Sequence, residues 1–132
     1  MTKKDKIIYS YISNIIDDEK SNKLQFLTKK DISKFLKRIE KTSVESASIS
    51  PKIEEYNNCD MYIVLDDIEI CENQIGTIKN LLSQKIVIFT SFEKNKTTDE
   101  MMLKLGFQTE LRDKNANLKC FSYNLRTYNN KR

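Results

Sequence analysis

The chain contains no histidine. Histidine is the commonest general base and a frequent metal ligand, because its ordinary pKa lies close to neutral pH. Its absence excludes catalysis by serine–histidine and cysteine–histidine pairs, and it removes the commonest ligand of transition metals.

Glycine is also scarce, with only two among the 132 residues and none before Gly76. Loops that hold nucleotide phosphates need glycine, because a residue without a Cβ lets the backbone approach the ligand closely. The first half of the chain therefore lacks both the P-loop pattern and the dinucleotide-binding pattern.

Cysteines are few and the apolar runs are short. The three cysteines, Cys59, Cys71 and Cys120, are an odd number without C-x-x-C spacing, so neither a disulfide framework nor a zinc site is indicated. The longest apolar run, Met61 to Leu65, is far shorter than the roughly 20 residues of a membrane span. We expect a cytoplasmic protein that spans no membrane and binds no metal, with Cys120 as a buried free thiol.

The length of 132 residues suits one domain, residues 1–132, with a single compact fold. Charge is distributed unevenly along it. Residues 42–72 hold one basic and eight acidic side chains, a net charge of −7, whereas the segments on either side are basic. Such asymmetry can attract partners of opposite charge, although a compositional bias toward lysine, asparagine and isoleucine would produce it as well.

Apolar spacing predicts helices that alternate with strands. Thr28 is the expected N-cap of the second helix, and Gly106 is the glycine expected to close the last one just after its end. The predicted helices are 3–17, 28–39, 73–83 and 97–105, and the predicted strands are 23–27, 47–50, 61–65, 85–89, 107–112 and 118–125.

Alternation of this kind favours parallel pairing, while the final two strands must form an antiparallel hairpin. The predicted fold class is therefore α/β: a Rossmann-like, mostly parallel sheet with an antiparallel C-terminal hairpin and helices on both faces.

Residues 60–125 resemble the C-terminal half of class I S-adenosylmethionine-dependent methyltransferases. The segment 60–65, D-M-Y-I-V-L, resembles their central "D-x-apolar" strand, and 81–88 resembles the helix end and strand that follow. The segment 103–107, L-K-L-G-F, is similar to the junction before their terminal hairpin. The resemblance implies a methyltransferase-like fold, in a truncated bacterial form of unknown function.

The cofactor-binding residues of that family have no counterpart here. Where the family has an acidic residue and G-x-G after its first strand, this chain has Leu27-Thr28-Lys29-Lys30-Asp31. The acid expected after the next strand would fall near Ser50-Pro51-Lys52, and Glu54 comes too late. Because of these departures from the family pattern, we expect no cofactor and no catalytic residue.

Two groups of side chains could still form a site. Asp66, Asp67 and Glu69 follow a buried strand at the edge where open α/β sheets bind ligands, and oxygen-rich clusters suit magnesium or calcium. A solvated loop that caps the next helix is the alternative.

Lys119, Phe121, Tyr123 and Arg126 alternate basic and aromatic residues, as nucleic-acid-binding strands do. Any terminal strand with two different faces gives the same pattern. The turn at Thr28-Lys29-Lys30 could likewise bind an anion or merely cap a helix.

The sequence predicts a non-catalytic methyltransferase-like scaffold, a pseudoenzyme that acts as a protein-interaction module with an unidentified partner. A methyltransferase with an unorthodox or partner-completed cofactor site is the alternative, and a nucleic-acid-binding protein is a further one.

Overall fold

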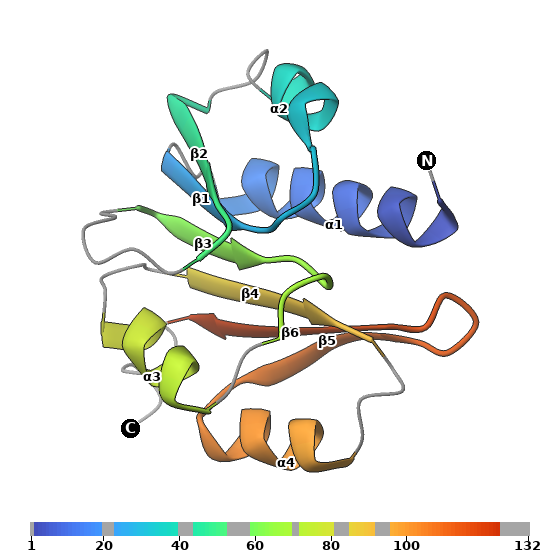
Figure 1. Ribbon diagram of the computed structural model, residues 1–132, viewed down its shortest axis with the longest axis vertical. Helices are drawn as coiled ribbons and strands as arrows, with labels where there is room; N and C mark the ends of the chain where they lie inside the picture. The colour runs from blue at the N-terminus through green and yellow to red at the C-terminus, as the bar shows by residue number, and fades with distance from the viewer. Residues whose placement is uncertain are drawn as a thin grey trace.

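The computed structural model describes residues 2–19, 23–39, 44–52, 59–69, 72–80, 85–91 and 96–124. Along these ranges helices alternate with strands, except that β2 is followed directly by β3 and the chain ends with two strands (Figure 1). In chain order the elements are α1 (Lys3–Glu19), β1 (Lys23–Leu27), α2 (Ser33–Ile39), β2 (Ser46–Ser50), β3 (Met61–Val64), α3 (Glu72–Asn80), β4 (Lys85–Thr90), α4 (Lys96–Lys104), β5 (Gln108–Asp113) and β6 (Leu118–Asn124).

The strands form one six-stranded sheet in the order β2-β1-β3-β4-β6-β5. β1 pairs in parallel with both β2 and β3, and β3 pairs in parallel with β4. β6 then pairs antiparallel with β4 and with β5. The predicted fold class, a mostly parallel α/β sheet with an antiparallel C-terminal hairpin, is confirmed.

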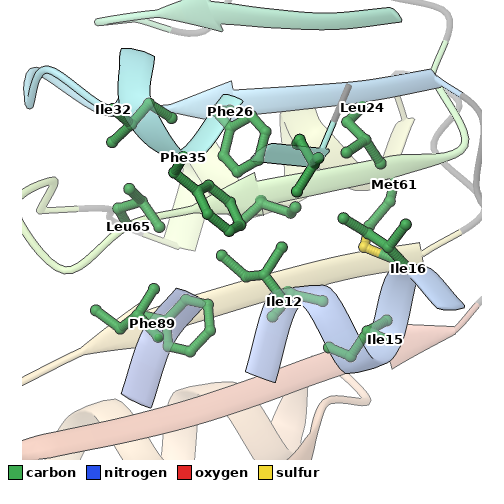
Figure 2. Packing of buried hydrophobic residues seen from close by; sticks show 14 of the residues in the cluster. Ile12, Ile15, Ile16, Leu24, Phe26, Ile32, Phe35, Met61, Leu65 and Phe89 are labelled. Carbon is green, nitrogen blue, oxygen red and sulfur yellow. The ribbon is translucent and has the colours of Figure 1, made fainter. Parts of the chain in front are cut away.

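One face of the sheet is covered by α1 and α2. Because side chains alternate along a strand, Leu24 and Phe26 of β1 point to this face together. Figure 2 shows them packed with Phe35 of α2 and with isoleucines of α1. Phe35 also stacks on Tyr9 with ring centroids 4.4 Å apart. The four isoleucines that α1 buries, at helical spacing, are Ile8, Ile12, Ile15 and Ile16.

The opposite face is covered by α3 and α4. Ile75 and Ile78 of α3 and Met102 of α4 pack there against Tyr62, Val64 and the even-numbered isoleucines of β4. β3 and β4 are therefore buried on both faces, as their continuous apolar runs predict. The prediction of helices on both faces is confirmed.

Local signals in the sequence set two of the helix ends. The Thr2 hydroxyl accepts a hydrogen bond from the Asp5 backbone N–H at 3.1 Å and caps α1. After α4, Gly106 adopts a φ of 92°. Its N–H donates to the Leu103 carbonyl at 3.1 Å, and the Phe107 N–H donates to Met102 at 2.9 Å. These two bonds form a Schellman motif.

No helix in the described ranges is both long enough and apolar enough to cross a bilayer. Cys59 and Cys120 are buried free thiols, while Cys71 lies outside the described residues. Burial raises the pKa of the Cys59 thiol to about 11 and that of Cys120 above its ordinary value as well. Neither thiol therefore has the lowered pKa of a reactive cysteine.

Candidate functional site

The turns that follow β1 and β3 lie side by side at the carboxyl-terminal edge of the sheet. Leu27 is in register with Val64, and the Leu65 N–H donates to the Leu27 carbonyl at 3.1 Å. The Thr28 N–H donates to the Ser50 carbonyl at the end of β2, at 3.0 Å. Three parallel strands thus end together at the position where open α/β sheets bind ligands.

The Asp67 carboxylate binds directly to the turn after β1. The Thr28 hydroxyl donates to one of its oxygens at 2.6 Å, and the Lys29 backbone N–H donates to the other at 2.7 Å. The Thr28 side-chain oxygen also accepts a hydrogen bond from the Lys30 N–H at 3.0 Å. Thr28 is only 1% exposed. The Asp67 carboxylate therefore binds the hydrogen-bond donors of this turn in the way that a bound anion would.

This arrangement corrects the expected start of the second helix. Thr28 is not its N-cap, because α2 begins only at Ser33 and the Thr28 hydroxyl oxygen accepts the Lys30 N–H within the turn. The Asp31 carboxylate instead accepts the N–H of Ser33, the first residue of α2, at 3.0 Å. Of the two interpretations of this turn, an anion site or a helix cap, the structure shows its donors bound to an anion of the chain itself, the Asp67 carboxylate.

Asp66 joins a second cluster together with Lys4, Asp5 and Lys30. The Lys30 ammonium lies 2.5 Å from an Asp66 oxygen, the Lys4 ammonium lies 3.1 Å from the other, and Asp5 lies 3.4 Å from Lys30. The Asp66 side chain is 10% exposed. The cluster, with two positive and two negative charges, connects α1 to the turns after β1 and β3.

The pKa values of this cluster show how strongly its members are coupled. Burial would raise the pKa of Asp66, but hydrogen bonds and charges from Lys30 and Lys4 outweigh it and hold the pKa below its ordinary value. Burial would lower the pKa of Lys30, but Asp66 and Asp5 raise it above its ordinary value. Both groups are therefore charged at neutral pH.

Of the three residues of the predicted acidic site, Asp66 and Asp67 lie at the predicted edge but bind the turn after β1. Glu69 is exposed. Within the ranges that the structure describes, no group of three or more acidic or cysteine side chains is positioned to hold a metal ion. Asp66 is in addition paired with Lys4 and Lys30, which neutralise its charge.

The alternating residues of the last strand do not form a surface. Lys119 is 2% exposed, Phe121 is fully buried and Tyr123 nearly so, because β6 lies between β4 and β5 rather than at the edge of the sheet. The aromatic rings pack in the core beneath α3 and α4. The prediction that this strand forms a nucleic-acid-binding face is therefore corrected, because β6 is an interior strand of the sheet. Arg126 lies outside the described residues.

Lys119 instead forms a partly buried ion pair that the sequence pattern did not indicate. Its ammonium lies 3.0 Å from an oxygen of Asp99 on α4, and the Arg112 guanidinium lies 3.0 Å from the other oxygen. Burial would raise the pKa of Asp99, but its hydrogen bonds with Lys119 and Arg112 hold it below its ordinary value. The carboxylate therefore connects α4 to the terminal hairpin.

Among solved structures, the chain is similar to one described as the "methyltransferase domain of bacterial-CtHen1-CN", with a TM-score of 0.53 and 11% identity. The match covers 93% of this chain and all of that one, so the fold is methyltransferase-like over nearly its whole length. No curated protein matches the chain. A family model described as "Family of unknown function (DUF6231)" matches residues 7–132, and the chain belongs to this family.

Proposed function

We propose that this protein is a non-catalytic, methyltransferase-like scaffold that acts by binding another protein. The observation that carries the proposal is the occupation of the turn after β1 by Asp67. The Lys29 N–H and the Thr28 hydroxyl, which face the position of a cofactor in such folds, both donate to this carboxylate.

The residues of the turn after β1 do not fit a cofactor bound in the manner of class I methyltransferases. A bound nucleoside would have to displace Asp67 and pass the side chains at positions 28–30, where a glycine would offer bare backbone. It would also meet the ion cluster of Lys4, Asp5, Lys30 and Asp66. Breaking these partly buried ion pairs would cost roughly 1 to 3 kcal/mol, because the charges lose their partners without regaining full solvation.

The acidic segment 42–72 gives less support to a partner than its net charge alone suggests. Asp66 and Asp67 are engaged within the molecule, and Asp60 accepts the Lys23 N–H at 3.0 Å. Within the described part of this segment, Glu45 and Glu72 are in exposed positions. The described acids that bind within the molecule are therefore not available to a basic partner.

A thermal shift measurement with S-adenosylmethionine tests the proposal. A site saturated a hundredfold above its Kd would stabilise the protein by about 2.7 kcal/mol, which raises the Tm of a domain of this size by roughly 10 °C. We expect no change in Tm. A rise would contradict the proposal and support the methyltransferase alternative.

An Asp67→Asn variant would locate any such binding. It removes the charge from the turn and keeps one oxygen acceptor, so a cofactor bound against Thr28 and Lys29 would change its affinity. A cofactor bound elsewhere would bind the variant and the wild type equally. Glu69→Gln, an exposed change two residues away, is the matched control.

A further inference from the structure

β2 is an edge strand of the sheet that the described residues form. It pairs with β1 on one side, and no strand of the described ranges pairs with it on the other. Ser46 and Ser48 are exposed, and Ile49 is 42% exposed. Ile49 and Leu103 are the large apolar side chains left exposed in the described part of the chain.

The other edge strand, β5, is protected in ways that β2 is not. β5 carries Glu110, Arg112 and Asp113, and its register shifts at a bulge between Thr109 and Leu111. Charges and bulges are the usual features that prevent an edge strand from pairing with another chain. β2 has the sequence S-A-S-I-S, with neither charge nor proline. It is therefore the edge suited to pairing.

The direction in which each β2 residue points its backbone groups determines which N–H and C=O groups lie on the outer side of the strand. The Ser50 carbonyl accepts the Thr28 N–H, so Ser50 points its backbone groups toward β1. Because backbone direction alternates along a strand, Ser48 does the same, and Ala47 and Ile49 direct their N–H and C=O groups outward. The next outward position is Pro51, which has no N–H and ends the usable edge.

We propose that two copies of this chain associate through β2, antiparallel about a two-fold axis beside Ser48. In this register Ala47 of each copy lies opposite Ile49 of the other, and all outward N–H and C=O groups of these residues pair across the interface. Ile49 packs against the small Ala47 of the second copy, and serine lies opposite serine on the other face. The sheet becomes continuous through both copies.

The antiparallel direction is also favoured by charge. Exposed Glu45 precedes the strand and exposed Lys52 follows it. Antiparallel pairing places Glu45 of one copy near Lys52 of the other, whereas parallel pairing would place like charges together. An association of this symmetry uses the same patch on both copies and closes at two, as in most homodimers.

This inference goes beyond the proposed function and does not depend on it. Pairing uses the outer side of β2, whereas the occupied turn follows β1 and involves Thr28, Lys29 and Asp67. A dimer is compatible with a cofactor-free scaffold and with an enzyme. The thermal shift experiment tests the proposed function and an association experiment tests the dimer, so the outcome of one does not decide the other.

Sedimentation equilibrium of the full chain over a range of concentrations tests the proposal. The wild type should form dimers, while Ser48→Lys and Ser48→Glu should each weaken association by at least about fivefold, because equal charges then lie opposite one another. An equimolar mixture of the two variants should restore it. Moderate salt is used to screen the exposed lysines of α2, which would lie on the same face in both copies.

Thr109→Lys on β5 is the matched control, because it adds the same charge to the other edge and should leave association unchanged. Ser48 is exposed, so circular dichroism should show that both of its variants remain folded. A wild type that stays monomeric at every concentration would overturn the proposal. So would dimers that tolerate Ser48→Lys, or variants that fail to associate when mixed.

Discussion

Asp66 illustrates how one side chain determines what this edge of the sheet can do. Its two oxygens bind Lys30 and Lys4, which come from different segments of the chain. In another setting the same carboxylate, at the end of a buried strand, would suit a cation or a substrate hydroxyl. Here the lysines use its charge to hold α1 against the turns.

Asp66→Asn is expected to reduce the free energy of unfolding at neutral pH by roughly 1 to 3 kcal/mol, because two lysines lose their carboxylate partner. The loss should depend on pH. A carboxyl whose pKa is lowered by folding contributes its full stability above its unfolded pKa, near 4, and loses it as pH falls through the folded value. The difference between wild type and variant should therefore shrink on acidification.

Urea unfolding at a series of pH values measures this effect. Asp17→Asn on the exposed end of α1 is the matched control, and it should give a small difference from the wild type at each pH. A difference between Asp66→Asn and the wild type that stays constant down to pH 2 would contradict the coupling of Asp66 to the lysines.

At the scale of elements, replacing each of the two glycines by alanine is expected to change the stability of the protein in opposite directions. Gly106 has a φ of 92°, where a Cβ is strained, so Gly106→Ala should destabilise the protein by roughly 1 to 2 kcal/mol. Gly76 lies inside α3, where an added Cβ would have no atom within 4 Å. Gly76→Ala should therefore stabilise the protein by roughly 0.5 to 1 kcal/mol.

Thermal and urea unfolding of the two variants check both signs. Because each replaces glycine by alanine, the unfolded chain gains the same restriction in both cases, and the difference between them reports the folded state alone. Equal effects of the two changes would contradict the left-handed conformation at Gly106.

The elements were predictable from sequence where local signals decide them. β1 begins and ends as predicted, at Lys23 and Leu27, and the helix stop at Gly106 follows from its conformational freedom. The start of α2 was not predictable, because the Thr28 hydroxyl oxygen accepts an N–H within its own turn, and that turn is held by Asp67, 39 positions away. A threonine that closes a turn and one that caps a helix both accept an N–H a few residues further on, so local spacing cannot distinguish them.

The candidate site was predictable in position but not in character. That Asp66 and Asp67 follow a buried parallel strand indicates the edge of the sheet, and the structure places them there. That lysines from two other segments neutralise Asp66 depends on tertiary packing. For β6 the order of the strands decided the outcome, because alternation of Lys119, Phe121 and Tyr123 gives no sign that α4 and β5 cover the strand.

At the scale of the whole molecule, the sheet separates two apolar cores, and its two edges differ from its centre. β3 and β4 contribute to both cores, so their amides should open only on global unfolding and exchange most slowly with solvent. β2 has a helix-covered face, and no described strand pairs with its outer side. Its amides should therefore alternate in protection according to the direction in which each N–H points.

Residue-resolved hydrogen exchange followed by NMR measures this alternation. In dilute protein the outward amides of Ala47 and Ile49 should exchange quickly, and the amide of Ser48, which faces β1, should exchange more slowly. Raising the protein concentration should then slow Ala47 and Ile49 selectively, because antiparallel pairing of two copies hides those two amides first. If the Ser48 amide is protected and those of Ala47 and Ile49 exchange quickly at every concentration, the result agrees with the fold but contradicts the association. Uniform protection along β2 in dilute protein would contradict its position as an open edge.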